Sequence, residues 1–501
     1  MTARAGSRRT VDEGDGGGGG VTLTADPTRV LGQLFVPGHA LAGENEGKAS
    51  SAVAHVLGLS EVEVKAALAD IDVRFGARHR DLTEMFERHA ERLANRVLPD
   101  VELSEQQRLL LGATFTQEYA VEATSVCNPS AVPAVDQTGL ASGALRFVLS
   151  IRQIGEGHCS SVGFRQGVLG SDGRVEIDRR GPFTTAGIVA EATLDATLFR
   201  DLAGARAAES ERWVLDGLGV RFTAGQLHAR LHELESQQDT RRGVPNTVAR
   251  FMERASRCYT VEFPRSAPLE ERVLTPSCAA ESNGVEDARF VRFTGDDGVV
   301  TYYATYTAYD GEAIRQQVLE TTDFQTFDSS PLLGEAAGNK GLALFPRPIG
   351  GEFFALSRHD GAINSVARSD DIRHWRTAVP LRAADRVWSC VQVGNCGSPI
   401  ELDEGWLVLT HGVGPMRTYS IGALLLDLDD PTIVLGQTEH PLIEPTPGDR
   451  NGYVPNVVYS CGALRHADRI LVPLGTADSR ISFVTLNVAD VLNSLTDPRQ
   501  K

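Results

Sequence analysis

The chain has 501 residues, of which 42% are hydrophobic and 23% charged, and its formal net charge at pH 7 is -17. This composition is typical of a globular protein with a sizeable core, and the acidic excess argues against nucleic acid or an anionic membrane as a partner. No apolar run in the sequence approaches the roughly 18 residues that a membrane span requires.

The start of the chain and the cysteines indicate where the protein works. Residues 1–24 include arginines, acidic residues and a glycine run, without the apolar segment of a signal peptide, and we interpret them as a disordered tail. The seven cysteines are scattered and form no CxxC pair, so we expect neither a zinc site nor a disulfide framework. The reducing cytoplasm is therefore the expected location.

Residues 25–112 are predicted to form helices. Ser60 and Glu63 have the spacing of a capping box, in which each side chain bonds a free backbone amide at the start of a helix. Further along, apolar residues recur at helical spacing and would form one face: Leu82, Met85, Phe86, Leu93 and Val97. We expect this region to serve in packing or assembly, or to form one wall of a binding site, because it carries no cluster of catalytic residue types.

Short alternating strands with Gly- and Asp-rich turns are predicted for residues 113–190 and 266–495. They are separated by residues 191–265, which are rich in Ala, Leu, Glu and Arg and predict a helical insertion. Residues 496–501 are assigned to a short tail. The chain is therefore expected to be mainly β, with a helical N-terminal region and a helical insertion.

The strand-rich parts contain a weak internal repeat. Asp323 and Asp371 occupy equivalent places in two copies of a short motif, 48 positions apart, which is near the length of a four-stranded propeller blade. A strand that ends in a polar, Gly-flanked turn also recurs, at 144–152, 300–306, 352–358, 405–411 and 469–475. These copies predict a five-bladed β-propeller, with a β-sandwich with solvated turns as the alternative.

In a propeller, the ends of equivalent strands meet at one mouth of the central channel. The recurring strands end in polar or ionisable residues, which we expect at this mouth: Arg152, Tyr306, Arg358, His411 and, just after the last strand, Asp478.

The segment 283–289 combines two adjacent carboxylates with an arginine. One carboxyl group can be held protonated by the charge of its neighbour while Arg289 orients the other, an arrangement suited to acid catalysis at a sugar. On spacing alone, Glu286 and Asp287 are also compatible with a solvated turn.

This segment resembles the Glu-Asp-Pro-Arg signature of glycoside hydrolase family 130, in which the aspartate is the proton donor. Other segments are similar to motifs of that family in the same order along the chain: 127–130 followed by Arg152, 306–311, 339–346, 405–413 with 424–431, and 454–458 with 475–478. The resemblance covers residues 115 to 495 without the insertion. Two departures are Ala288 in place of the signature proline, and Arg450-Asn451-Gly452 where many members carry a Tyr-Glu pair.

The resemblance implies inverting cleavage of a β-mannosidic bond, with Asp287 as the general acid that protonates the glycosidic oxygen through a sugar hydroxyl. By the same resemblance, the residues that would bind the substrate are Asn128, Arg152, Glu286, Arg289, Tyr309, Asp310 and Asp478. In phosphorylases of this family, inorganic phosphate attacks the anomeric carbon. The hydrolytic members use carboxylates to activate water and lack the basic residues that hold phosphate.

A cationic cluster on the nucleophile side therefore separates the two reactions. The sequence offers such residues on successive predicted blades, which favours phosphate as the co-substrate: Lys340, Arg358, His359 and His411. Solvated rim charges, or pairs with Asp310 and Asp360, are the alternative interpretation. For the function, the alternatives are a β-mannoside hydrolase, a non-catalytic glycan-binding propeller, and the reverse mannosyl transfer from mannose 1-phosphate.

No cofactor or metal is predicted. Glu156, His158 and Cys159 lie close together, but no second ligand cluster accompanies them, and we interpret them as a turn. The expected partners are a carbohydrate and phosphate, with no nucleic acid and no membrane, and self-association into a homo-oligomer is left open.

Overall fold

The structure is a computed structural model that describes residues 21–36, 46–97, 103–202, 209–237, 241 and 243–497. The chain forms two compact units, a smaller one of residues 26–123 with 181–185, and a larger one of residues 1–25, 124–180 and 186–501. Most of the tails predicted at 1–24 and 496–501 lie outside the described residues. None of the helices in the described ranges is long and apolar enough to cross a membrane.

The smaller unit consists of helices and one antiparallel strand pair. Its elements are β2 (Val30–Leu34), α1 (Glu46–Leu57), α2 (Glu61–Phe75), α3 (Leu82–Val97), α4 (Glu105–Thr114) and β3 (Thr116–Ala120). The capping box predicted at the start of α2 is confirmed, because the Glu63 amide donates to Ser60 Oγ over 3.4 Å and the Ser60 amide donates to Glu63 Oε2 over 2.8 Å. On the predicted apolar face of α3, Leu82, Met85, Phe86 and Leu93 are buried, and the Val97 side chain lies outside the described residues.

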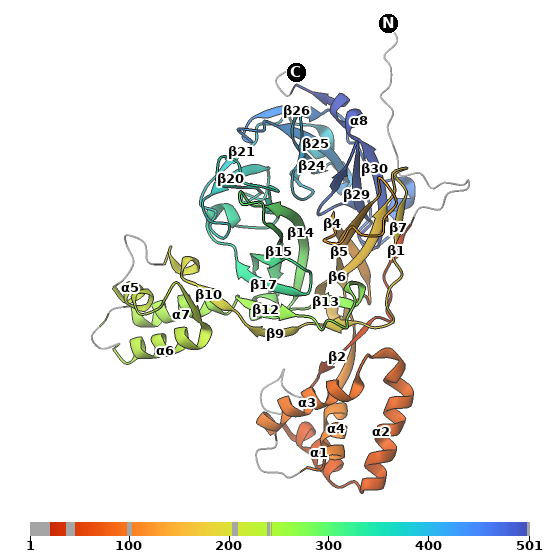
Figure 1. Ribbon diagram of the computed structural model, residues 1–501, viewed down its shortest axis with the longest axis vertical. Helices are drawn as coiled ribbons and strands as arrows, with labels where there is room; N and C mark the ends of the chain where they lie inside the picture. The colour runs from red at the N-terminus through yellow and green to blue at the C-terminus, as the bar shows by residue number, and fades with distance from the viewer. Residues whose placement is uncertain are drawn as a thin grey trace. The chain divides into compact units, whose positions relative to one another are not determined.

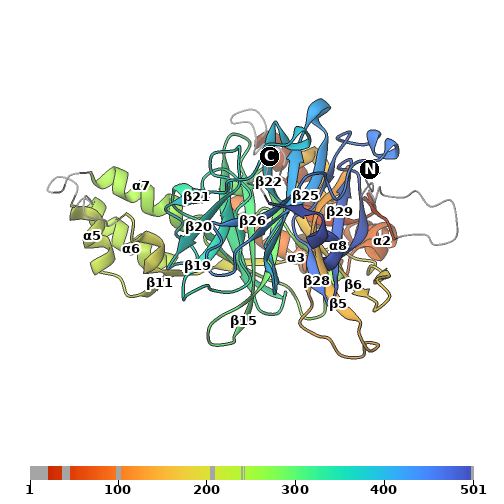
Figure 2. The same cartoon turned by 90° about the horizontal axis from the view of Figure 1, so that it is seen from above.

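The larger unit is mainly β, as predicted, and its strands fall into antiparallel groups in chain order. The first group contains β4 (Ser125–Pro133), β5 (Leu145–Ile154), β6 (Ser160–Leu169) and β7 (Val175–Ile177), and the second contains β14 (Gly284–Thr294), β15 (Val300–Tyr309), β16 (Ile314–Thr321) and β17 (Thr326–Pro331). The third group contains β18 (Ala343–Leu344), β19 (Phe353–Ser357), β20 (Ser365–Ser369) and β21 (Ala378–Pro380). The fourth contains β22 (Gln392–Asn395), β23 (Ile400–Leu402), β24 (Gly405–Val413), β25 (Tyr419–Leu426) and β26 (Val434–Thr438), and the fifth contains β27 (Val458–Tyr459), β28 (Leu464–His466), β29 (Arg469–Thr476) and β30 (Arg480–Asn487). Figure 1 shows these groups following one another around a common centre, and Figure 2 shows their strands running roughly along the axis of that arrangement.

Each strand predicted from the repeat occupies the same place in its group. β5, β15, β19, β24 and β29 all lie between two antiparallel neighbours. Their alternating apolar side chains pack between neighbouring groups, as in the cluster of Leu407, Leu409, Ile470 and Val472. Strand β14 joins the preceding group through a parallel pairing of Gly284 with Ser160.

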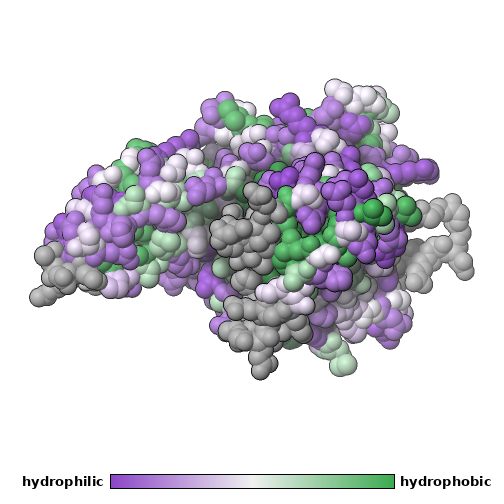
Figure 3. All heavy atoms as spheres, turned by 90° about the horizontal axis from the view of Figure 1, so that it is seen from below, coloured by the Kyte–Doolittle hydropathy of each residue, from purple (hydrophilic) through white to green (hydrophobic). Residues whose placement is uncertain are grey.

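The described part of the region 191–265 contains the α-helices α5 (Glu209–Asp216), α6 (Ala224–Glu235) and α7 (Val244–Ala255), which share a buried apolar core. It also contains strands that the sequence interpretation missed: β10 (Thr193–Asp195), β11 (Arg221–Thr223) and β12 (Tyr259–Glu262). With β9 (Ile188–Glu191), β12 extends the β14–β17 group, because Tyr259 and Val261 alternate with more exposed residues in the manner of a strand. On the face drawn in Figure 3, the surface of this region is mainly hydrophilic.

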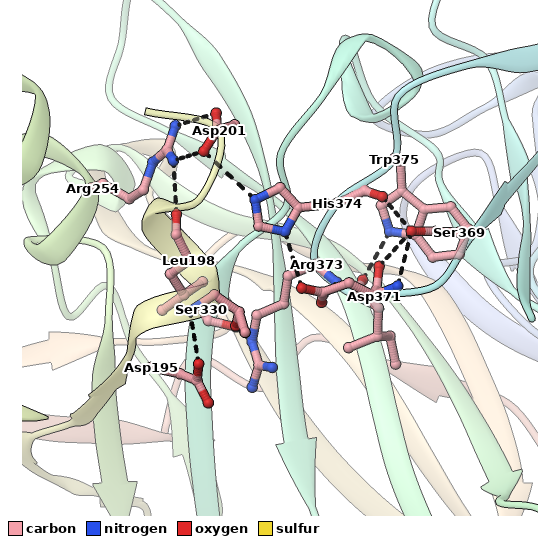
Figure 4. A network of polar contacts seen from close by, with 12 residues as sticks. Asp195, Leu198, Asp201, Arg254, Ser330, Ser369, Asp371, Arg373, His374 and Trp375 are labelled. Atoms are coloured by element: carbon pink, nitrogen blue, oxygen red, sulfur yellow. Dashed lines mark hydrogen bonds and ion pairs between the residues drawn. The ribbon is translucent and has the colours of Figure 1, made fainter. Parts of the chain in front are cut away.

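A histidine ties the helical insertion to the strand groups (Figure 4). His374 Nδ1 lies 3.2 Å from Asp371 Oδ2, and His374 Nε2 lies 3.6 Å from Asp201 Oδ1 in the insertion. Arg254 of α7 donates to the same Asp201 carboxylate over 3.1 Å. Burial opposes the charged imidazolium, but the two carboxylates outweigh it and raise the pKa of His374 to about 9.

His374→Gln should lower the free energy of unfolding by about 1–2 kcal/mol at pH 6, a figure reduced from the full linkage value because the Asp201 side chain is 39% exposed. The raised pKa means that this stabilisation is complete below the ordinary histidine pKa of 6.5 and is lost as the pH rises through 9. Urea unfolding of the variant and the unaltered protein at pH 6 and pH 10 measures the difference in stability. The control is His228→Gln, because the His228 side chain is exposed on α6. An equal deficit at both pH values would contradict the prediction.

Candidate active site

Two β-bulges bring a polar side chain from β4 next to one from β14. In each strand an extra residue shifts the register, between Cys127 and Ser130 in β4 and between Glu286 and Arg289 in β14. The bulged residues Asn128 and Asp287 have positive φ angles of 48° and 57°, a conformation that L-residues seldom adopt. Their side chains meet, with Asn128 Nδ2 donating to Asp287 Oδ1. Strain of this kind is typical of functional sites, where the fold holds a side chain in a required direction.

Arg152 on β5 holds both carboxylates of the Glu286–Asp287 pair. Its Nη1 lies 3.0 Å from Asp287 Oδ1 and its Nη2 lies 2.5 Å from Glu286 Oε1. Its Nε donates to Ser160 Oγ over 2.9 Å, so the guanidinium is fixed from three sides. The three charged side chains are 12–18% exposed, which leaves them partly desolvated and still accessible.

The two adjacent carboxyl groups have pKa values shifted in opposite directions. Burial raises the pKa of Glu286, and the charge of Asp287 adds to this shift. Burial acts in the same direction on Asp287, but Arg152, Lys340 and the hydrogen bond from Asn128 outweigh it and hold its pKa well below the usual range. The two pKa values are therefore separated, and the group with the raised pKa is Glu286.

A third carboxylate, Asp478, follows β29 in the left-handed region at φ 46°. Burial, followed by the negative charge of Asp287, raises its pKa to about 6. The acidic groups Glu286, Asp287 and Asp478 thus share one region with Arg152, and one of them titrates close to neutral pH.

Asp478→Asn should stabilise the free protein by about 1–3 kcal/mol at pH 8 and by almost nothing near pH 4. The Asp478 carboxyl group has its ordinary pKa of 3.8 in the unfolded chain and a pKa of about 6 in the folded chain. The charged carboxylate therefore destabilises the folded protein progressively as the pH rises from 3.8 to about 6, and by its full amount above about pH 6. Urea unfolding at the two pH values measures the gain, with exposed Asp403→Asn as the control. A variant that is less stable than the unaltered protein at pH 8 would show that Asp478 is a stabilising group.

A buried chain of hydrogen bonds lies beside the carboxylates and joins residues from four strand groups. Arg289 Nη2 donates to the Tyr459 hydroxyl over 2.8 Å, and its Nη1 lies 3.5 Å from the Asn395 carbonyl oxygen. His411 Nδ1 lies 3.2 Å from the same oxygen, and His411 Nε2 lies 3.2 Å from Arg358 Nη1. Burial, with the charges of Arg358 and Arg289, lowers the pKa of His411 to about 3, so this imidazole is neutral. It therefore donates to Asn395 and accepts from Arg358, which orients that guanidinium.

Two of the predicted phosphate-binding cations have no carboxylate partner among the described residues. Lys340 is close enough to lower the pKa values of both Glu286 and Asp287, yet it makes no ion pair in the described parts of the chain. Its loop is held by a hydrogen bond of 2.7 Å from Asn395 Nδ2 to the Gly341 carbonyl oxygen. The Arg358 Nε is buried without a hydrogen-bond partner there. Unpaired buried donors of this kind require a ligand or water to satisfy them.

The ion pairs that the sequence offered as an alternative are not formed. Asp310 accepts from Arg315 Nη1 over 2.6 Å and from the amides of its own turn. Asp360 accepts from the amides of Ala362 and Ile363. Both carboxylates are therefore used locally, and neither compensates Lys340 or Arg358.

Some residues expected at the site have other surroundings. Arg152, Tyr306 and His411 do not lie at strand ends, as the recurring pattern suggested, because β5 continues to Ile154, β15 to Tyr309 and β24 to Val413. The Tyr306 hydroxyl is buried against Glu281. The Tyr309 hydroxyl donates to the Gly311 carbonyl over 2.8 Å, within its own turn. The His359 amide donates to Ser357 Oγ, and its Nδ1 is buried without a hydrogen-bond partner in the described residues. Sugar contacts of Tyr309 and Asp310, and phosphate contacts of His359, stay predictions.

Sequence reasoning missed two members of the site, Asn395 and Tyr459. Tyr459 follows the segment 454–458 that had been singled out, so its neighbourhood was visible but its contact with Arg289 was not. Asn395 acts through its backbone oxygen as well as its side chain, for which the residue type gives no signal. Among the described residues, no group of three His, Cys, Asp or Glu is placed to hold a metal ion.

Comparison with known proteins identifies related sequences. Residues 262–497 match the model of glycoside hydrolase family 130, described as beta-1,4-mannooligosaccharide phosphorylase. The 1,2-beta-oligomannan phosphorylase of Thermoanaerobacter sp. is 34% identical over 230 residues, which are 44% of this chain and 75% of that protein. The beta-1,2-mannobiose phosphorylase of Listeria innocua is 31% identical over 237 residues, 45% of this chain and 64% of that protein. A solved structure of the Listeria enzyme with beta-1,2-mannobiose aligns at TM-score 0.45 and 20% identity, covering 75% of this chain and 92% of its own.

Proposed function

We propose that this chain, which belongs to glycoside hydrolase family 130, cleaves β-mannosides by inverting phosphorolysis, a reversible reaction that yields mannose 1-phosphate and a shortened sugar. Its relatives include phosphorylases of 1,2-linked and 1,4-linked mannosides. The observation that carries the proposal is the pair of cations, Lys340 and Arg358, that have no carboxylate partner among the described residues beside the Glu286–Asp287 pair.

The proposed scaffold is a five-bladed β-propeller with its site at one mouth. Two features support it: the strand groups follow one another around a common centre, and each recurring strand has the same place in its group (Figure 1). In such a scaffold, the first strands of neighbouring blades lie close together. The hydrogen bond between Asn128 and Asp287, on β4 and β14, agrees with this arrangement.

In the proposed mechanism, Asp287 is the general acid and protonates the glycosidic oxygen through a sugar hydroxyl. The proposed contacts of the sugar are Asn128, Arg152, Glu286, Arg289 and Asp478. Asn128 and Arg152 also hold the Asp287 carboxylate. The low pKa of Asp287 in the free protein depends partly on Lys340. A phosphate dianion bound at Lys340 would counter that positive charge and raise the proton affinity of Asp287 when the donor is required.

Phosphate is the proposed nucleophile because charged donors favour it. Lys340 supplies a point charge, and Arg358 supplies a planar fork of donors held in place by His411. Bound there, the anion would satisfy Arg358 Nε and face the anomeric carbon from the side opposite the acid. This geometry would give a product of inverted configuration.

The test is incubation with β-1,2- and β-1,4-linked mannobiose and mannotriose, with and without inorganic phosphate, followed by product analysis. We expect mannose 1-phosphate in the presence of phosphate and almost no cleavage in its absence. Equal cleavage in phosphate-free buffer, with free mannose as the product, would make the protein a β-mannoside hydrolase. Binding without cleavage in either buffer would favour a glycan-binding role.

Three further expectations from the sequence belong to the same proposal. The protein would act in the cytoplasm, where its cysteines stay reduced. The helices of residues 46–97 and 105–114 would serve in packing, assembly or one wall of the acceptor site. Size determination in solution will establish whether the chain forms a homo-oligomer.

A further inference from the structure

A pocket opens at one end of the β22–β26 group, and its lining includes none of the carboxylates of Glu286, Asp287 and Asp478. It has a volume of about 440 Å³, and its lining includes Arg386, Trp388, Ser420, Glu439 and Glu444. β24 ends at Val413, β25 begins at Tyr419 and β26 ends at Thr438, so the lining segments follow the strand ends that lie near His411. The pocket therefore lies at the end of the group where the proposed active site is found.

The indole ring of Trp388 packs directly against the backbone of two glycines, Gly412 and Gly422. A Cβ atom added to Gly412 or Gly422 would lie 2.4 Å or 2.6 Å from the indole ring, so the ring is seated directly against these glycines of β24 and β25. The indole N–H donates to the Glu439 carbonyl over 3.3 Å. The ring is thus fixed before any ligand arrives, and it remains half-buried, with a surface that lines the pocket.

The polar groups around this ring include both donors and acceptors. Glu439 and Glu444 supply carboxylate oxygens, and Arg386 supplies a guanidinium. Arg386 Nε is buried and has no hydrogen-bond partner in the described parts of the chain. A fixed aromatic surface with a few convergent polar groups is the composition of a small-molecule site, and an unpaired buried donor calls for a ligand or water.

We propose that this pocket binds a pyranose unit of an oligosaccharide, with the sugar stacked on Trp388 and its hydroxyls bonded by Arg386, Glu439 and Glu444. A pyranose has an apolar face of C–H groups and a rim of hydroxyls, which matches an apolar ring bordered by charged donors and acceptors. The inference rests on the proposed function for the choice of sugar. A sugar site at Trp388 would let the protein bind long substrates at two places, and would therefore favour oligosaccharides over disaccharides.

The test measures binding without turnover, in an Asp287→Asn background, with β-1,2- and β-1,4-mannotetraose as probes and the matching mannobioses for comparison. We expect mannotetraose to change the indole fluorescence of the parent protein. Trp388→Ala should abolish this change, and it should raise the ratio of the Kd for mannotetraose to the Kd for mannobiose about tenfold. Trp388→Phe should restore most of the affinity because a flat ring remains. Exposed Val391→Ala is the control and should leave the Kd ratio unaltered.

The proposal is overturned if Trp388→Ala binds mannotetraose as tightly, relative to mannobiose, as the parent protein does. It is also overturned if neither tetraose changes the fluorescence of the parent protein. Failure of the proposed function would be seen separately, as the absence of mannoside cleavage by the unaltered chain. The binding assay does not depend on that activity.

Discussion

Asp287→Asn should lower the rate of mannoside phosphorolysis by about 10²- to 10⁴-fold, which is the usual effect of removing a general acid. The asparagine keeps the size of the side chain and a hydrogen-bond acceptor for Arg152, but it carries no transferable proton. Steady-state kinetics at saturating phosphate, with mannose 1-phosphate as the measured product, would show the loss in kcat.

The matched control is Asp297→Asn at the exposed turn between β14 and β15, the same substitution at the other end of the same strand pair. It should retain nearly full activity. Unchanged far-UV circular dichroism of Asp287→Asn will establish that the fold is intact. A folded Asp287→Asn protein with near-normal kcat would assign the proton donor to another group, and Glu286, with its raised pKa, would be the first to examine.

Removing either unpaired cation should weaken phosphate binding far more than mannoside binding. Lys340→Ala and Arg358→Ala should each raise the KM for phosphate about ten- to a hundredfold, the effect of losing one charge-assisted hydrogen bond to an anion. In the double variant, the KM for phosphate should rise by less than the two single effects combined, because both side chains bind the same anion. Initial rates over a matrix of phosphate and mannobiose concentrations will separate the two KM values.

Arg368→Ala, at a side chain that is 70% exposed on β20, is the control for loss of a positive charge without loss of a phosphate contact. It should leave both KM values almost unchanged. If Lys340→Ala or Arg358→Ala raises the mannoside KM and leaves the phosphate KM alone, that residue binds the sugar, and the anion site must be sought elsewhere.

The repeat predicted the strands well because each recurring strand is a run of mostly buried residues followed by a polar turn, as in β24 and β29. The prediction failed where a strand is longer than its clearest pattern, so Tyr306 was expected at an end and lies inside β15. It also failed for β12, a four-residue strand at the end of a segment dominated by helix-forming residues. Local composition reports the average tendency of a segment, whereas β12 is stabilised by pairing with β9 and β17, which are distant in sequence.

For the site, the sequence could name residue types but not their mutual contacts. Asn128 and Asp287 are 159 positions apart, and they meet because each lies in a bulge that no residue pattern marks clearly. The direction of the pKa shifts also depended on geometry. Glu286 and Asp287 are adjacent and chemically alike, and Asn128 and Lys340 act mainly on the second of them.

The pairing of β9 with β12 has a consequence for how this protein could have acquired its helical insertion. The antiparallel register sets Glu191 opposite Tyr259, so the chain leaves the sheet and returns to it at points about 5 Å apart. A tight two-residue turn spans the same gap in an ordinary hairpin. The two ends of the segment from 192 to 258 thus meet at one place in the sheet, although the segment also contacts the strand groups through Asp201 and His374. It could therefore be gained, exchanged or removed as one unit while every other strand keeps its neighbours.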